Sequence, residues 1–178
     1  DDTGSRGLGD VYKRQSDHLP KTQKYLPKQR LWYIRANEVL ISSGSIERPL
    51  VFGNNDTPGV MLSSAAKEYM KVYGVLVGKK PLIFTNNDSG YETAIEFKKN
   101  GVNPIILDTR SNPSSDIITE AKNLNIEIRF SYVVVAAKGY KKVKSADIAK
   151  ISDDKKELFN IENIKCDCIC VSGFWTPS

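Results

Sequence analysis

The sequence has little of what metal sites and nucleophilic catalysis use. It contains a single histidine, His18, and three cysteines among 178 residues. His18 lies in a loop-like segment with prolines nearby, where a catalytic or metal-binding role is not expected. No nucleophile with a neighbouring base and no pair of carboxylates in a shared pocket stands out. We therefore expect any chemistry to belong to a bound cofactor that the chain positions.

The three cysteines, Cys166, Cys168 and Cys170, alternate along one short apolar run. In a strand, this spacing puts all three side chains on the same face. Structural zinc sites prefer cysteines in C-x-x-C pairs, so the pattern favours small buried side chains in a reducing cytoplasm over a metal site. The C-x-x-C and C-x-x-x-x-C motifs expected of a disulfide reductase are absent.

Charge and hydropathy argue against two classes of partner. The chain has 26 lysine and arginine residues against 21 aspartate and glutamate residues, a formal net charge of +5. The lysines are spread along the chain, and no basic tract with interleaved aromatic residues suggests nucleic acid. No apolar run is long enough to cross a membrane, and no signal peptide is recognisable. These features predict a cytoplasmic protein without a membrane partner.

Residues 1–15, DDTGSRGLGDVYKRQ, do not resemble part of any fold. Codons for residues 10–15 can be written as the end of a transposase library adapter, and residues 5–9 match the adapter upstream of it. We therefore exclude the residues before Ser16 from the fold analysis as a non-native segment. The same observation predicts that the chain is a fragment of a longer protein.

Residues 81–110 predict a strand, a polar turn, a helix and a second strand. Residues 81–85 and 104–107 are short apolar runs, typical of strands that are covered on both faces. Between them, apolar side chains recur at helical spacing from Tyr91 onward. Gly101 follows, where a left-handed residue commonly ends a helix.

The turn in this unit occupies the place where dinucleotide-binding βαβ units carry G-x-G-x-x-G. Its residues are Thr85, Asn86, Asn87, Asp88, Ser89 and Gly90. Of the three glycines only the last is kept, and Gly90 can let the helix pack closely on the strand. The alternative is a well-formed turn that holds no phosphate, because Asn87 can adopt a left-handed conformation and Asp88 or Ser89 can cap the helix.

Asp108 ends the second strand about twenty residues after the turn, where an acidic side chain can accept a hydrogen bond from a ribose 2′-hydroxyl. We therefore include it among the candidate NAD-binding residues. A solvated strand end is the alternative, and the neighbouring Arg110 could instead favour a 2′-phosphate.

Two further apolar runs close on a serine and a glycine. Both runs are predicted to be buried strands: residues 39–42 lead into Ser43-Gly44, and residues 166–171 lead into Ser172-Gly173. We include these four serine and glycine residues among the candidate cofactor-binding residues. The remaining pattern predicts helices over 63–73 and 115–124, a strand over 126–130, a hairpin of residues 132–137 with 140–144, and an edge strand over 158–161.

Residues 35–94 resemble the alpha subunit of heterotetrameric sarcosine oxidases. Three separated blocks carry the resemblance, at residues 42–52, 55–62 and 85–91. The departures are small: Ser42 and Ser43 stand where the family has Ala-Thr, and Gly90 stands where alanine is common. Phe174 departs from the family's Ser-Gly-Gly-Trp-x-Pro pattern.

The resemblance implies an α/β fold. It implies a Rossmann-like dinucleotide-binding domain of the two-domain flavoprotein reductase type, with a β-hairpin excursion and part of the neighbouring FAD/NAD domain. Residues 16–60 would belong to the first dinucleotide-binding domain and the crossover. Residues 61–165 would form an inserted NAD(P)-type domain, and residues 166–178 the return strand into the first domain.

The resemblance also implies an activity. Such complexes oxidatively demethylate sarcosine to glycine and transfer the one-carbon unit to tetrahydrofolate. The whole complex would contain NAD, FAD and FMN, and the alpha subunit would assemble with beta, gamma and delta subunits. This piece would supply the dinucleotide-domain scaffold and no catalytic residue.

Two rival functions stay open. One is another NAD(P)- or FAD-dependent oxidoreductase subunit, such as a dye-linked amino-acid dehydrogenase or a pyridine nucleotide reductase. The other is an assembly scaffold that has lost nucleotide binding, which the degenerate turn would suit. We expect the principal dinucleotide to lie against the first domain and the Ser43-Gly44 crossing, because Asn87 and Asp88 put side chains where a pyrophosphate would lie.

Overall fold

The computed structural model describes residues 33–152, 154 and 156–177. The predicted adapter-derived segment and His18 lie outside these residues. The chain divides into two units, residues 1–42 and residues 43–178.

In the first unit, residues 33–42 form neither helix nor strand. The strand predicted over residues 39–42 is therefore wrong. Val39, Leu40 and Ile41 are at least 79% exposed. None of the described residues pairs with this segment, and a strand without a neighbour is not stable in water.

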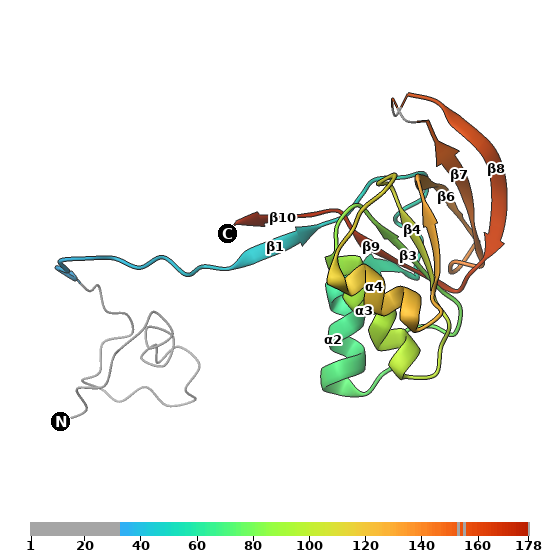
Figure 1. The fold of residues 1–178 in the computed structure, drawn as a ribbon. Coiled ribbons are helices and arrows are strands. Elements are labelled where there is room, and N and C mark those ends of the chain that lie inside the picture. The colour runs from blue at the N-terminus through green and yellow to red at the C-terminus, as the bar shows by residue number, and fades with distance from the viewer. Residues whose placement is uncertain (1–32, 153, 155, 178) are drawn as a thin grey trace. The chain divides into compact units, whose positions relative to one another are not determined.

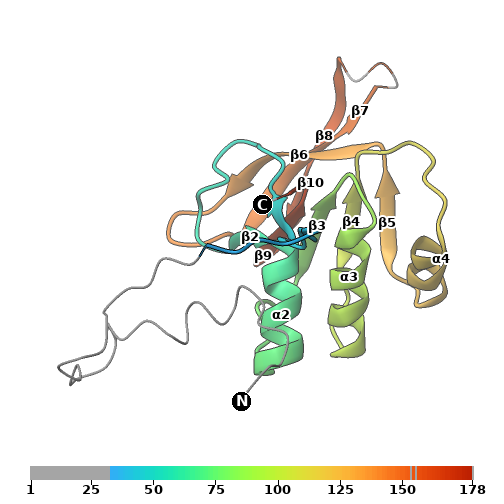
Figure 2. The same ribbon diagram turned by 90° about the vertical axis from the view of Figure 1, so that its left-hand side faces the viewer.

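The second unit is built on a five-stranded parallel sheet (Figure 2). Its order is β2 (Val60–Leu62), β9 (Cys168–Ser172), β3 (Pro81–Thr85), β4 (Ile105–Asp108) and β5 (Glu127–Phe130). Every residue of β3 and β9 is buried. That burial explains why their sequences are continuous apolar runs with no alternation of polar residues.

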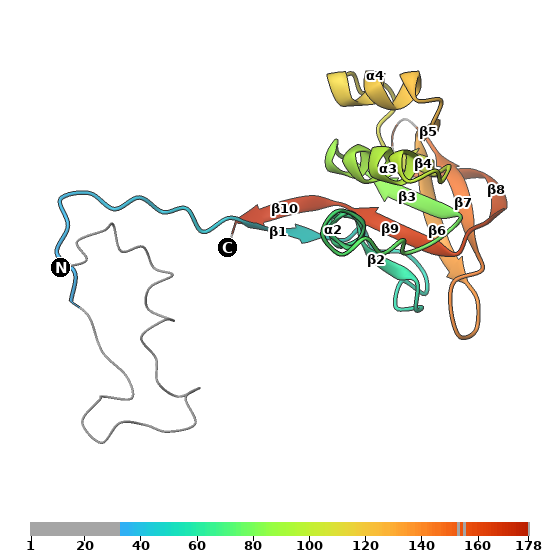
Figure 3. The same ribbon diagram turned by 90° about the horizontal axis from the view of Figure 1, so that it is seen from below.

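Three helices pack against one face of this sheet, α2 (Ser63–Tyr73), α3 (Ser89–Lys99) and α4 (Asp116–Asn123) (Figure 3). Their buried side chains form one hydrophobic core with Ile83, Ile106 and the thiols of Cys168 and Cys170. Gly74 and Gly101 follow α2 and α3 with φ of 63° and 78°. Both glycines therefore end their helices in the left-handed region, as the sequence predicts for Gly101.

A three-stranded antiparallel sheet covers the other face and forms a second hydrophobic core with it. It consists of β6 (Tyr132–Lys138), β7 (Ser145–Ile151) and β8 (Leu158–Lys165). The predicted hairpin excursion is therefore present, but the strand expected over residues 140–144 is wrong. Those residues form the loop, which the Lys144 N–H closes by donating to the Lys138 carbonyl at 2.8 Å.

A two-stranded antiparallel ribbon of β1 (Ser45–Arg48) and β10 (Phe174–Pro177) leaves the main sheet (Figure 1). At its base the Gly173 N–H donates to the Arg48 carbonyl at 2.9 Å. A Cβ at Gly173 would lie 2.6 Å from that carbonyl oxygen, so the close approach of the two strands requires glycine.

The predicted fold class is confirmed, whereas the boundary predicted at residue 165 does not match the strand pairing. β9 lies in the middle of the main sheet, between β2 and β3, and only β10 beyond it leaves that sheet. β9 is thus the last strand of the Rossmann-like sheet. An interior strand read from sequence alone carries no sign of which neighbours it pairs with.

All three cysteines are buried free thiols. Cys168 and Cys170 share the helix-covered face, as predicted, but Cys166 precedes β9 and packs into the other core. Within the part of the chain that the structure describes, no helix is long and apolar enough to span a bilayer.

Candidate functional site

The carboxyl ends of the parallel strands bring most of the predicted site residues together. Thr85 ends β3 and residues 86–90 follow it, Asp108 ends β4, and Ser172 ends β9 with Gly173 directly after it. The sheet continues from β3 to β4 on one side, whereas β9 lies on the other. The gap between the ends of β3 and β9 is therefore a topological switch point, the place where open α/β sheets bind ligands.

The Asn87 side chain bridges this switch point. Its amide nitrogen donates to the carbonyl of Gly173 at 2.8 Å and to that of Ser172 at 3.3 Å. Its amide oxygen accepts from the Ser89 N–H at 2.8 Å and from the Ser172 hydroxyl at 3.3 Å. The Asn86 N–H adds a bond of 3.3 Å to the Ser172 carbonyl. Loop and strand end are thus joined by hydrogen bonds within the chain.

Asn87 also supplies the cap of α3. Asp88 is the N-cap residue but makes no side-chain capping bond, so the predicted cap by Asp88 or Ser89 is replaced by the Asn87 oxygen on the Ser89 N–H. Asn87 is not among the described residues with positive φ, contrary to expectation. A helix N-terminus offers its free N–H groups to anions, and here one of them is already occupied.

Gly90 has the role predicted for the third glycine. A Cβ at Gly90 would lie 2.7 Å from the Thr85 Cβ, so α3 starts in close contact with the end of β3. The Thr85 hydroxyl is itself engaged, donating to the Asn87 carbonyl at 2.8 Å and accepting from the Asn87 N–H at 3.1 Å. Thr85 therefore stabilises the turn from within.

Asp108, which the sequence predicts as a ribose acceptor, is fully buried. One carboxylate oxygen accepts from the Arg110 N–H at 2.9 Å and from Arg110 Nε at 3.0 Å. The other accepts from the Tyr91 hydroxyl at 2.7 Å and from Arg110 Nη2 at 2.8 Å. Burial, reinforced by Asp108, raises the pKa of Tyr91 well above its ordinary value. The carboxylate is satisfied inside the chain.

Arg110 is paired a second time, with Asp88 at 2.8 Å. Burial lowers the pKa of Arg110, but hydrogen bonds with Asp108 and Asp88 outweigh burial and raise the pKa above its ordinary value. Two carboxylates neutralise this guanidinium, so a 2′-phosphate would have to compete with both.

Ser43 and Gly44 do not join this cluster. They precede β1, at the end of the ribbon where Ser45 pairs with Pro177, and both are exposed. Gly44 has φ of 78°, and no atom lies within 4 Å of a Cβ built there. The structure therefore separates the predicted crossing residues from the Thr85–Gly90 loop.

Trp175 is a site residue that the sequence analysis missed. Its indole N–H donates to the Ser89 hydroxyl at 2.9 Å and so ties β10 to the start of α3. The Trp of the family's Ser-Gly-Gly-Trp-x-Pro pattern was the available signal.

Glu47 was also missed. It is 4% exposed, and one carboxylate oxygen accepts from the Ser64 N–H at 2.9 Å. Helix α2 has no acidic residue of its own in the first turn, so Glu47 in β1 supplies the negative charge favoured there. Its other oxygen and the Ser63 hydroxyl are buried without a hydrogen-bond partner in the described part of the chain.

The residues of the β3–α3 loop do not fit a dinucleotide pyrophosphate well. The Asn87 side chain lies at the switch point and accepts a hydrogen bond from the Ser89 N–H at the start of α3. Asp88 adds a negative charge beside it. Among residues 33–152, 154 and 156–177, no group of three histidine, cysteine, aspartate or glutamate side chains could hold a metal ion.

Comparison with solved structures shows to which class of folds this chain belongs. The chain is similar to thioredoxin reductase from T. acidophilum, with a TM-score of 0.61 and 17% identity over 76% of this chain and 43% of that one. For thioredoxin reductase from Giardia duodenalis the TM-score is 0.61 and the sequence identity 19%, again over 76% of this chain and 43% of that one. For histamine dehydrogenase from Rhizobium sp. 4-9 the TM-score is 0.56 and the sequence identity 16%, over 76% of this chain and 22% of that one. The unit is a Rossmann-like domain of the flavoprotein reductase type.

Sequence comparison narrows the class. The chain is similar to sarcosine oxidase subunit alpha of Rhizobium meliloti (strain 1021), 34% identical over 166 residues, 93% of this chain. The same subunit of Corynebacterium sp. (strain P-1) is 32% identical over 84% of the chain. The chain spans only 16% of the length of these two relatives. No family model matches the chain. The predicted resemblance to sarcosine oxidase alpha subunits is thus confirmed.

Proposed function

We propose that this chain is the Rossmann-like scaffold part of an oxidoreductase subunit of the sarcosine oxidase alpha type. The complete protein would oxidatively demethylate sarcosine to glycine and pass the one-carbon unit to tetrahydrofolate. It would work in a complex with beta, gamma and delta subunits that contains NAD, FAD and FMN. Support comes from similarity over 93% of the chain to a subunit of that name.

One observation supports a scaffold role for this part, namely the Asn87 bridge. In a dinucleotide-binding βαβ unit, the loop backbone lies open so that a pyrophosphate can approach the helix N-terminus. Here the side chain of Asn87 accepts a hydrogen bond from the Ser89 N–H and donates one to the Gly173 carbonyl. The principal dinucleotide would then lie against the first domain and the Ser43-Gly44 crossing.

The oxidation itself would be carried by the flavin. The described residues would fix the relative positions of the helices and strands. Hydrogen bonds from Asn87 and Trp175 fix the start of α3 to β9 and β10, and Glu47 fixes β1 to α2. These contacts set the position from which the ribbon leaves the sheet.

A second candidate is a pyridine nucleotide reductase on the same scaffold. The likeness to thioredoxin reductases favours it, at TM-scores up to 0.61. The absence of a C-x-x-C or C-x-x-x-x-C motif argues against the disulfide-reducing version.

Expression of the complete subunit with the companion subunits encoded beside it tests the proposal. We expect sarcosine-dependent oxygen consumption, with one-carbon transfer when tetrahydrofolate is added. A purified complex that ignores sarcosine but oxidises NAD(P)H in the presence of a dye or another acceptor would reject the proposal in favour of the reductase.

A further inference from the structure

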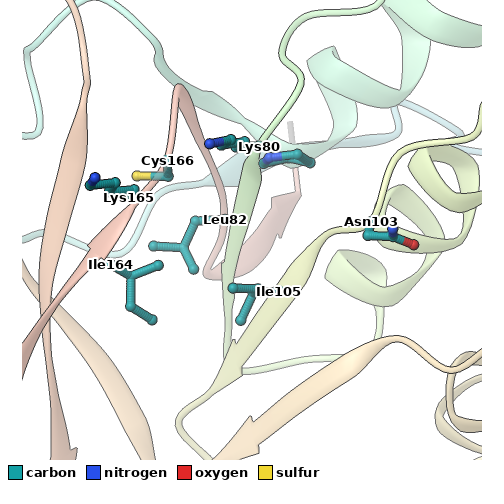
Figure 4. Close-up of a pocket in the computed structure, with 8 residues that line it drawn as sticks. Lys80, Leu82, Asn103, Ile105, Ile164, Lys165 and Cys166 are labelled. Carbon is teal, nitrogen blue, oxygen red and sulfur yellow. The ribbon is translucent and has the colours of Figure 1, made fainter.

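A small cavity of about 170 Å³ lies at the amino edge of the main sheet, the edge opposite the candidate site. Leu82, Ile105 and Ile164 converge on it from β3, β4 and β8 (Figure 4). Lys80, Lys165 and Asn103 complete its lining together with Pro81 and Cys166. We call this feature the amino-edge pocket. It combines an apolar interior with a polar, basic rim.

The size of the cavity limits what can enter it. Sites for cofactors and drug-sized ligands enclose about 300–1,000 Å³. An engineered cavity of about 150 Å³ holds one benzene molecule. The amino-edge pocket, at about 170 Å³, therefore suits one aromatic or branched aliphatic side chain better than a dinucleotide or a folate.

The rim carries positive charge that the described part of the chain leaves unpaired. Within the described residues, none of the ion pairs involves Lys80, Lys144 or Lys165, and all three are exposed. Lys144 lies beside the cavity because its carbonyl accepts from the Cys166 N–H at 3.3 Å. The neighbouring Asp167 carboxylate is engaged with the backbone N–H groups of Lys79 and Lys80, both at 2.8 Å.

Isolated surface lysines are ordinary solvated groups, but lysines around an apolar cavity match the pattern of an interface. Interfaces bury an apolar centre inside a polar rim, and complementary charge across that rim selects the partner. The carboxyl edge of the sheet gives rise to the β1–β10 ribbon. The ribbon therefore does not cover the amino edge, which is free to contact another protein segment.

We propose that the amino-edge pocket docks an acidic segment of a companion subunit. One apolar side chain of that segment enters the cavity, and flanking carboxylates pair with Lys80 and Lys165. This inference rests on the proposed function, since the relatives are named as alpha subunits and such a name implies further subunits.

The test uses the complete subunit co-expressed with its companions. The double variant Lys80→Glu/Lys165→Glu reverses the rim charge, and Ile164→Phe fills the cavity without changing charge. Lys150→Glu is the matched control, because Lys150 is exposed at the other end of the antiparallel sheet. Complex dissociation is measured by sedimentation at low and high salt.

We expect the double variant to weaken assembly by about tenfold or more at low salt, with the loss shrinking as salt screens the charges. Ile164→Phe should weaken assembly at every salt concentration, and Lys150→Glu should leave it unchanged. Unchanged assembly of the double variant, or loss in Lys150→Glu alone, overturns the proposal.

Thermal unfolding of the alpha subunit alone tests whether another part of the same polypeptide occupies the amino-edge pocket. If the double variant and Ile164→Phe destabilise the lone subunit as much as the complex, another part of the same polypeptide covers the pocket and the proposal is wrong. Sarcosine turnover of the wild-type complex is recorded separately. A complex that assembles without oxidising sarcosine rejects the proposed function and still reports on docking.

Discussion

The side-chain amide of Asn87 donates a 2.8 Å hydrogen bond to the carbonyl of Gly173, and so joins the turn after β3 to the residue after β9. The two residues are separated by 86 positions in the chain, and their contact spans the switch point of the sheet. A ligand phosphate entering there would have to displace this bond and the Asn87 bond to the Ser89 N–H. The crevice is thus closed by the chain's own polar groups.

Replacement of Glu47 should loosen the start of α2. Glu47→Ala removes the acceptor of the Ser64 N–H and a buried carboxylate at a helix N-terminus. Loss of a comparable cap costs about 0.5–2 kcal/mol. Urea unfolding of the chain measures the change, with Glu120→Ala on the exposed side of α4 as control. Equal unfolding midpoints for Glu47→Ala and the wild type would contradict the capping role.

Asp108 should matter for stability more than Tyr91 does. Asp108→Ala leaves the buried Tyr91 hydroxyl without its partner and takes from Arg110 one of its two carboxylates, so that only Asp88 remains to it. We expect a loss of about 2–3 kcal/mol, because an unpaired buried polar group is costly and hydrogen bonds to a charged group are lost as well. Tyr91→Phe removes a single hydrogen bond and should cost about 1 kcal/mol. Chemical denaturation decides, and a larger loss for Tyr91→Phe than for Asp108→Ala would refute the network.

Stability should fall in alkaline solution. Burial, helped by Cys168 and Asp167, raises the pKa of the Cys166 thiol from 9.0 to about 12. Between these values the unfolded chain loses a proton that the folded chain keeps, so the folded state is favoured less as the pH rises. Unfolding midpoints at pH 8, 9 and 10 should therefore decline, and more gently in Cys166→Ala. An identical decline in both proteins would show that Cys166 is not responsible.

The sequence predicts the central βα unit well because each of its elements is fixed locally. Residues 81–85 form β3 with the predicted bounds, and Gly101 ends the helix with φ of 78°. An apolar run with a polar turn and a helix-ending glycine needs no distant partner to be recognised. Local pattern therefore suffices for this part of the fold.

Distant pairing accounts for what the sequence does not reveal. Nothing in the pattern around Glu47 indicates that it caps a helix 17 positions away. Asp108 appears as an exposed strand end until Tyr91 and Arg110 fold over it. The apolar residues before Ser43 read as a strand by composition, yet a strand forms only against a neighbour.

The central claim is that the Thr85–Gly90 loop is not where the principal dinucleotide is held. The most direct measurement is the NAD content of the purified complete subunit, extracted and quantified per polypeptide. Three variants are compared: Asn87→Ala with Asp88→Ala, Gly44→Val, and Gly101→Val as control. Gly44 and Gly101 share a φ of 78° and open space around the position of a Cβ, so the backbone strain of the two substitutions is matched.

We predict that the double alanine variant keeps nearly all of its NAD, that Gly44→Val loses much of it, and that Gly101→Val keeps it. Loss of NAD from the Asn87 and Asp88 variant, with NAD retained in Gly44→Val, would contradict the account and make the Thr85–Gly90 loop the cofactor site.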